Sequence, residues 1–132
     1  MYNKKVMEHF SHPRFFGKIE NPDVIGTAGN PRCGDLLTLY LKIDKKSNKI
    51  KDIKFETLGC AAAIAASDMI CELALGKTLK QAIKINFQDV SNELGALPPL
   101  KIHCAQLVTE ALRDAINNYP LKALPTGRQA EK

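Results

Sequence analysis

The sequence predicts an α+β fold, a small three-stranded antiparallel sheet with helices packed on one of its faces. Residues 36–43 and 50–58 alternate apolar and polar side chains, which is the pattern of strands with one buried face. The polar turn between them is short, so we expect an antiparallel hairpin. Residues 24–28 can add a third strand. Residues 61–75 and 102–118 instead repeat apolar side chains at helical spacing, which supplies helices to cover the sheet.

Glycine and proline mark the ends of these elements. A short helix over residues 3–10 should end ahead of Pro13, and the Gly-Asn-Pro run at residues 29–31 ends the first strand. Gly59 permits a sharp turn from the hairpin into the next helix, which is rich in alanine and therefore favours helical structure. Gly76 ends that helix.

The C-terminal half predicts three helical segments. Residues 78–85 begin with threonine and carry glutamine three positions later, which is the pattern of a capping box. Residues 89–94 supply one or two further turns, and the helix over residues 102–118 ends before a proline. We therefore expect one folded domain over residues 1–119 and a disordered tail over residues 120–132.

The composition is typical of a soluble domain. The chain has 132 residues, 45% of them hydrophobic, and can bury a core without disulfides. It has neither an apolar run that could span a membrane nor a signal-peptide core, so we expect a cytoplasmic protein without membrane contact. The net charge of +5 is modest, and its lysines are spread out, with small clusters at Lys45-Lys46 and Lys49-Lys51. We expect no nucleic-acid binding, and a basic face for an acidic protein partner fits this charge at least as well.

Four cysteines are present, and three of them lie in a loop or at the start of a helix, shortly after a glycine or proline. Cys33 lies in a tight Pro-Arg-Cys-Gly loop, and Asp35 is close enough for both side chains to reach one ion. Cys60 stands at the start of the alanine-rich helix. Cys71 lies on an apolar helix face, where we expect a core residue. None of the cysteines forms a CxxC pair, and we expect no disulfides in a reducing cytoplasm.

The third candidate is the His103-Cys104 pair, at the start of the last helix. Pro98 and Pro99 keep the preceding segment out of a helix. The N-terminus of a helix stabilises negative charge and thereby lowers the pKa of a thiol. An adjacent histidine and cysteine in this setting suit a thiolate ligand or nucleophile.

The three cysteine segments together predict a site for zinc, ferrous iron or an iron–sulfur cluster. The donors would be thiolates from Cys33, Cys60 and Cys104, with a carboxylate from Asp35 and an imidazole from His103. A mixed donor set holds a metal less tightly than four thiolates do. Such a site therefore fits a carrier better than a structural zinc domain.

Four motifs, in this order, resemble those of the IscU family, scaffold proteins for iron–sulfur cluster assembly that are also found as the N-terminal domain of NifU. The resemblance covers about residues 2–119. Its motifs are Lys5-Val6-Met7-Glu8-His9-Phe10 with His12-Pro13-Arg14, Gly29-Asn30-Pro31-Arg32-Cys33-Gly34-Asp35, Gly59-Cys60-Ala61-Ala62-Ala63-Ile64-Ala65, and Leu97-Pro98-Pro99-Leu100-Lys101-Ile102-His103-Cys104.

The resemblance implies a role for each candidate ligand. Cys33, Cys60 and Cys104 would hold the cluster. Asp35 or His103 would supply a further ligand, and Asp35 would make the cluster labile. Cys104 would accept persulfide sulfur from a cysteine desulfurase. The protein would collect Fe²⁺, carry a transient [2Fe–2S] cluster and pass it to apo iron–sulfur proteins. Such a scaffold is not an enzyme, and the purified protein could hold Zn²⁺.

The resemblance also implies protein partners. The segment Leu97-Pro98-Pro99-Leu100-Lys101 is similar to the one by which the family binds a specialised Hsp70 chaperone with its J-type partner, here with Leu100 where valine is usual. A ferredoxin or frataxin-like protein is a further implied partner, and a homodimer is compatible with the family.

Two other functions compete with the scaffold. One is a zinc-bound sulfur acceptor of the SufU type, but the chain lacks the insertion between the second and third cysteines that is typical of that type. The other is a small domain with a structural zinc, which would collapse without its metal.

Overall fold

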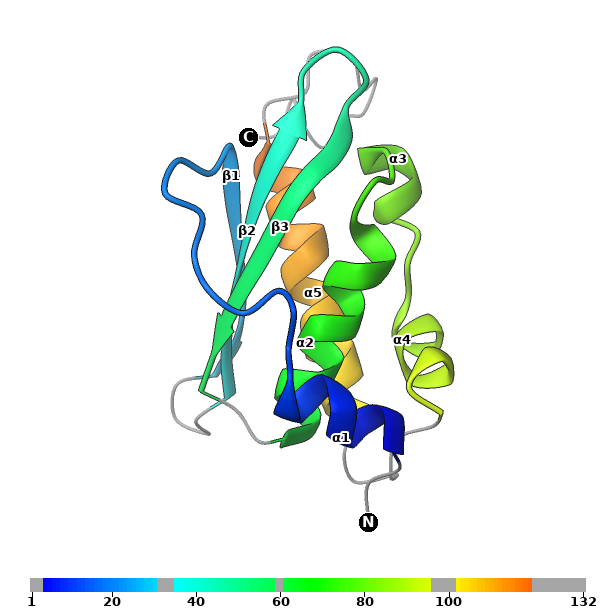
Figure 1. The fold of residues 1–132 in the computed structure, drawn as a ribbon. Helices are drawn as coiled ribbons and strands as arrows, with labels where there is room; N and C mark the ends of the chain where they lie inside the picture. Colours follow the sequence, from blue (N-terminus) through cyan, green and yellow to red (C-terminus); the bar gives the residue numbers. More distant parts are fainter. Residues whose placement is uncertain (1–3, 31–34, 59–60, 96–101, 120–132) are drawn as a thin grey trace.

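The computed structural model describes residues 4–30, 35–58, 61–95 and 102–119, with the backbone alone for Asn30 and Asp35. A short helix precedes three consecutive strands, and further helices follow the strands, which is an α+β arrangement (Figure 1). Their bounds are α1 Lys4–Ser11, β1 Val24–Asn30, β2 Asp35–Asp44, β3 Lys49–Thr57, α2 Ala61–Ala74, α3 Leu79–Ala82, α4 Phe87–Glu93 and α5 Ile102–Asn118.

The sheet has the order β1-β2-β3, and both pairs of strands are antiparallel. β1 pairs with β2 from Val24 opposite Leu41 to Asn30 opposite Asp35. The hairpin of β2 and β3 contains one irregularity, at Lys42/Ile43. The three-stranded antiparallel sheet expected from the sequence is thus confirmed.

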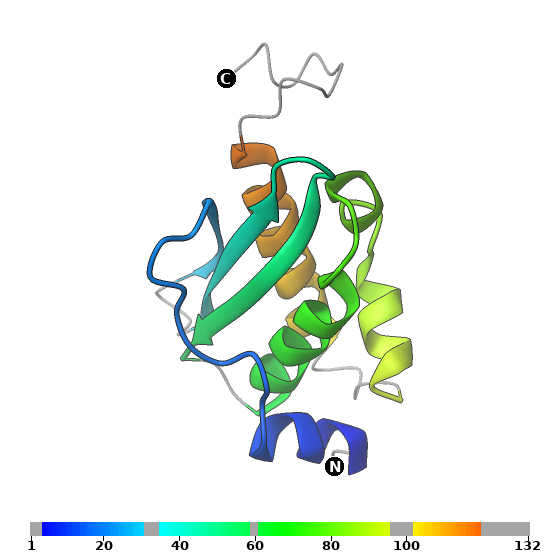
Figure 2. The ribbon, with the colours of Figure 1, turned by 45° about the horizontal axis from the view of Figure 1, so that its top comes forward.

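One face of the sheet carries the core, and α2 and α5 lie side by side across it (Figures 1 and 2). Alternate side chains of β2 point into this core because successive residues of a strand face opposite sides. The fully buried residues of the hairpin are Leu37, Leu39, Leu41, Ile43, Ile50, Ile53 and Phe55. Alanines of α2 and α5 are buried against them, and such small side chains let the two helices pack closely.

α5 runs along β1 at very short range. A Cβ atom on Gly26 would lie 2.3 Å from the carbonyl oxygen of Ala111 and 2.5 Å from the nitrogen of Ala115. The Asn118 amide donates to the carbonyl of Ile25 at 3.4 Å. The backbone N–H of Thr27 donates to a carboxylate oxygen of Asp114 at 2.9 Å. These contacts orient α5 antiparallel to β1, so α5 begins where β1 ends.

α2 has the same direction as α5. The N–H of Gly76, just beyond its C-terminus, donates to the carbonyl of Ile50 at 2.8 Å, near the start of β3. α2 therefore begins where β3 ends (Figure 1). We call this end of the molecule the helix-start end: β1 and β3 end there, β2 begins there, and α2 and α5 have their first turns there. The opposite end, with the β2–β3 turn and α3, is the hairpin end.

Most element bounds lie within one or two residues of those expected. The capping box of Thr78 and Gln81 is confirmed, but α3 spans only Leu79–Ala82. A second capping box, of Asn86 and Asp89, begins α4 two residues before the expected segment. In the parts of the chain that the structure describes, no helix is both long and apolar enough to cross a membrane. The expected tail, residues 120–132, lies outside the described residues.

Candidate functional site

Only part of the expected site falls within the described residues. Cys33, Cys60 and the segment Leu97–Lys101 lie outside them. Asp35 is the first residue of β2, and its backbone pairs with Asn30 at the end of β1. His103 and Cys104 lie in the first turn of α5.

The His103-Cys104 pair combines an exposed imidazole with a buried thiol. His103 is exposed, whereas Cys104 is only 1% exposed. The Sγ atom of Cys104 lies 3.7 Å from Nε2 of His103, within reach of a sulfur hydrogen bond. The imidazole can therefore exchange a proton with the thiol, and the positive end of the α5 dipole favours a thiolate at this position.

The packing of α5 on β1 fixes the level of this pair along the sheet. Cys104 precedes Asp114 by ten residues of helix, which is about 15 Å along the helix axis towards the helix-start end. Asn30 follows Thr27 by three residues of strand, which is about 10 Å towards the same end. Cys104 is thus near the level at which β1 ends and β2 begins. The chain neighbours of Cys33, Cys60 and Cys104 all belong to elements that start or end at the helix-start end.

Exposed apolar side chains surround a shallow hollow on the outer sheet face at this end. Leu58, directly after β3, is 86% exposed, and Leu36 and Phe16 are exposed as well. They line the hollow of about 280 Å³ together with Thr38, Glu56 and Thr57. The ring of Phe16 packs edge-on against Phe55, which anchors this wall of the hollow. Apolar side chains that remain exposed beside a candidate site are typical of surfaces that bind a partner.

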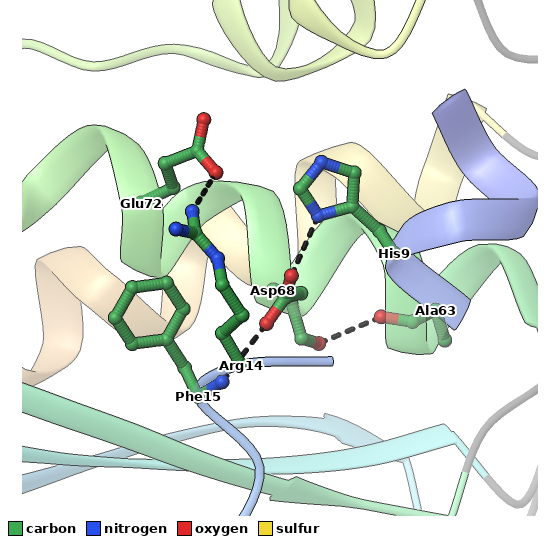
Figure 3. A network of polar contacts seen from close by, with 7 residues as sticks. His9, Arg14, Phe15, Ala63, Asp68 and Glu72 are labelled. Atoms are coloured by element: carbon green, nitrogen blue, oxygen red, sulfur yellow. Dashed lines mark hydrogen bonds and ion pairs between the residues drawn. The ribbon is translucent and has the colours of Figure 1, made fainter. Parts of the chain in front are cut away.

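The sequence did not predict a buried carboxylate beneath α1 (Figure 3). Asp68 of α2 is 1% exposed; its Oδ2 lies 2.6 Å from Nδ1 of His9, and its Oδ1 accepts the N–H of Phe15 at 3.0 Å. Arg14 forms an ion pair with Glu72 nearby. A hollow of about 550 Å³ is lined by Glu8, His9, His12, Arg14, Asp68 and Glu72.

These contacts hold α1 and the segment after it against α2. The sequence alone predicts surface positions for His9 and His12; His12 is exposed, whereas the side chain of His9 is half-buried against Asp68. The available signal was Asp68, a carboxylate within an otherwise apolar helix that needs a partner once it is buried. Among the described residues, no group of three or more His, Cys, Asp or Glu side chains is arranged to hold a metal ion.

A family model and individual relatives assign this chain to the same family. The family described as the NifU-like N-terminal domain matches residues 1–125. The chain is 55% identical over 119 residues to "Iron-sulfur cluster assembly scaffold protein IscU 1" of Archaeoglobus fulgidus, covering 90% of this chain and 76% of the relative. It is 42% identical over 121 residues to the IscU scaffold protein of Aquifex aeolicus, covering 92% and 77%.

A solved structure supports the same fold. The structure titled "Putative iron-sulfur cluster assembly scaffold protein for SUF system (FiSufU)", from Fervidobacterium islandicum, superposes with a TM-score of 0.71 at 29% identity, covering 87% of this chain and 96% of that one. Both the sequence relatives and the fold thus agree with the resemblance seen in the motifs. The chain belongs to the NifU-like N-terminal domain family, to which its IscU-named relatives point as well.

Proposed function

We infer that this chain is a scaffold on which iron–sulfur clusters are assembled before transfer to other proteins. The observation that carries this function is the family membership, because relatives 55% and 42% identical over nine-tenths of the chain are named as such scaffolds. A scaffold of this kind interacts with a source of sulfur, which is a cysteine desulfurase, and with the apo-proteins that receive the cluster.

We propose Cys33, Cys60 and Cys104 as the thiolate ligands of a [2Fe–2S] cluster, with Asp35 or His103 as a further ligand. The arrangement of the fold supports this set, since the elements that flank all three cysteines begin or end at the helix-start end. Thiolates suit iron–sulfur clusters, whereas a carboxylate is a weaker ligand for them. Replacing Asp35 with alanine should therefore slow the loss of the cluster.

Cys104 is the proposed acceptor of sulfur. Its thiolate would attack the outer sulfur of a desulfurase persulfide; a new S–S bond forms on Cys104, the old one breaks, and the desulfurase thiolate leaves. His103, with Nε2 at 3.7 Å from Sγ, is placed to take the thiol proton. Reduction of this sulfur to sulfide needs two electrons, and the proposed donor is a ferredoxin that delivers them one at a time in two encounters.

Iron and sulfur are cargo in this scheme and not a resident cofactor, so we propose a carrier without enzymatic turnover. Fe²⁺ is the iron source, and Zn²⁺ can occupy the same thiolates in the purified protein. The remaining proposed partners are a frataxin-like protein, an Hsp70 and J-type chaperone pair acting on Leu97–Lys101, and a second copy of the chain. The proposed location is the cytoplasm.

A zinc-bound sulfur acceptor is the second candidate. It is favoured by one observation, the structural likeness to a protein named for the SUF system. In that function Cys104 would still take up sulfur, but zinc would stay bound and no cluster would form.

Single-cysteine variants test the proposed ligand set. Anaerobic assembly with a cysteine desulfurase, cysteine and Fe²⁺ should give visible circular dichroism and bound sulfide with the parent chain. Cys33→Ser, Cys60→Ser and Cys104→Ser should each lose most of the signal, whereas Cys71→Ala should retain it because Cys71 is buried in the core. Loss of the signal in Cys71→Ala alone, or its full retention in Cys60→Ser, would contradict the assignment.

A further inference from the structure

The lysines of the hairpin end form a patch that the cluster chemistry does not use. Turn and strand residues come together there, on the side of the molecule opposite α1 (Figures 1 and 2). We define the hairpin lysine patch as Lys42, Lys45, Lys46, Lys49 and Lys51. All except Lys42 are exposed, and Lys42 is half-buried.

Backbone hydrogen bonds fix the position of the patch. The N–H of Leu79 donates to the carbonyl of Asn48 at 2.9 Å, and Asn48 itself has a positive φ of 58° that closes the turn. The N–H of Ile50 donates to the carbonyl of Lys77 at 2.9 Å, which anchors the start of β3 beside the turn. The lysine side chains of the patch therefore project from an ordered hairpin.

A bulge adds one of the lysines to the outer face. Lys42 pairs with Asp52 and Ile43 pairs with Ile50, so Lys51 is the extra residue of the β3 strand. Ile43 and Ile50 both point into the core. The lysines that flank them in sequence consequently face solvent.

The patch surrounds a hollow of about 370 Å³. Its lining consists of Asp23, Lys42, Ile43, Asp44, Lys45, Lys46 and Lys51. Both carboxylates already serve the backbone: Asp23 Oδ2 accepts the N–H of Ile43 at 2.6 Å, and Asp44 Oδ1 accepts the N–H of Lys46 at 2.9 Å. The two ion pairs among the described residues lie elsewhere, between α2 and the N-terminal segment. Within the described chain, then, no carboxylate is within ion-pair distance of a patch lysine.

We propose that the hairpin lysine patch docks a carboxylate-rich segment of a partner protein. Ammonium groups around a hollow would pair with glutamate or aspartate side chains that enter it, and the five lysines of the patch outnumber the nearby carboxylates at Asp23, Asp44 and Asp52. β2 separates the patch from the helix-start end by about 30 Å. A partner bound here leaves the cluster site free, so this surface serves a function in addition to cluster assembly.

The details of the patch favour a protein over a nucleic acid. Its cations are all lysines, without the arginine forks that read base edges and grip phosphates in pairs. Tyr40, the aromatic residue on the outer face of β2, donates its hydroxyl to Glu56 at 2.6 Å. A hollow also suits an entering side chain better than it suits the flat surface of a bilayer.

The test uses the full chain without metal and a fluorescein-labelled decaglutamate peptide as the probe. Fluorescence anisotropy at low salt should show binding that weakens at high salt. Lys45→Gln/Lys46→Gln should weaken binding by about fivefold, since surface ion pairs each contribute modestly. The matched variant Lys4→Gln/Lys18→Gln removes the same charge from exposed positions outside the patch and should change binding by less than about twofold.

Backbone amide shifts locate the peptide. The shifts that change should belong to residues 42–51, with those of Ile102–Cys104 unchanged. Equal weakening in both variants, shifts centred on the helix-start end, or no binding at low salt would overturn the proposal. Tighter binding to oligothymidylate or to phosphatidylserine vesicles than to the peptide would also overturn it. None of these results bears on cluster assembly, which is assayed separately.

Discussion

Two buried cysteines of this chain differ in what surrounds the sulfur. Cys71 lies within the core, where burial, and after it the charge of Asp68, raises the pKa of its thiol well above the usual value. Cys104 is also buried, but it begins a helix and has an imidazole nitrogen 3.7 Å away. Burial alone therefore does not distinguish a core cysteine from a cysteine of the candidate site. The groups around the sulfur atom do.

Cys71 should stay unmodified in the folded protein. A thiol with a raised pKa remains protonated, and the thiolate is the reactive form. Iodoacetamide at pH 8 should leave Cys71 unlabelled in the native chain and label it in urea, as peptide mass mapping would show. Cys71→Ala should lower the free energy of unfolding by about 1 kcal/mol and leave cluster assembly intact. Rapid native labelling of Cys71 would contradict its placement in the core.

Tyr40 should ionise at a higher pH than an unperturbed tyrosine. Its hydroxyl donates to Glu56, and this hydrogen bond, with burial and the charge of Glu56, raises the pKa of Tyr40 to about 12. In the unfolded chain the tyrosine ionises near pH 10, so the free energy of unfolding should fall as the pH rises from about 10 towards 12. Glu56→Gln should lower the pKa of Tyr40, measured from tyrosinate absorbance, with Tyr40→Phe as the assignment control. An unchanged titration in Glu56→Gln would contradict the hydrogen bond as the main cause.

At the scale of elements, the close packing of α5 on β1 depends on a single glycine. A Cβ at Gly26 would overlap the backbone of α5 at Ala111 and Ala115, and backbone cannot rotate away as a side chain can. We expect Gly26→Ala to lower the free energy of unfolding by about 3 kcal/mol in urea titrations. Thr27→Ala, on the exposed face of the same strand, is the control and should have a much smaller effect. Equal stability of Gly26→Ala and the parent would show that α5 lies farther from β1.

The elements themselves could be predicted from local patterns. Alternation in residues 36–43 and 50–58 gave the hairpin, and glycine at positions 59 and 76 bracketed α2. The extent of α3 was not predictable in the same way, because the capping box fixes where a helix begins but not where it stops. The β1–α5 contact could not be foreseen either, since Gly26 and Ala111 become neighbours only through the tertiary fold.

The site was predictable to a different degree. The position of His103 and Cys104 in the first turn of α5 is confirmed; the two prolines before them had predicted that the helix begins there. The contact between His9 and Asp68 was missed because it joins residues 59 positions apart in the chain. That the elements next to the cysteine segments start or end at one end of the sheet follows from strand order and helix direction, which local patterns do not encode. The ligand roles of Cys33, Asp35 and Cys60 stay predictions.

At the scale of the whole molecule, the two ends of the sheet carry different chemistry. The elements next to the proposed ligands start or end at the helix-start end, which also has exposed apolar side chains, and the hairpin end carries lysines. With the ligand set and the docking surface proposed above, a partner would bind at one end while the cluster is assembled at the other. Because the proposed ligands come from separate segments, metal binding should also stabilise the folded state by mass action.

Cluster transfer tests the scaffold function most directly. The parent chain, loaded anaerobically by a cysteine desulfurase with cysteine and Fe²⁺, is mixed with an apo-ferredoxin while visible circular dichroism is recorded. We expect the cluster bands of this chain to decline as those of the holo-ferredoxin rise, and Asp35→Ala to release its cluster more slowly. Persulfide on Cys104 with retained zinc and no cluster bands would contradict the scaffold and support the zinc-bound sulfur acceptor.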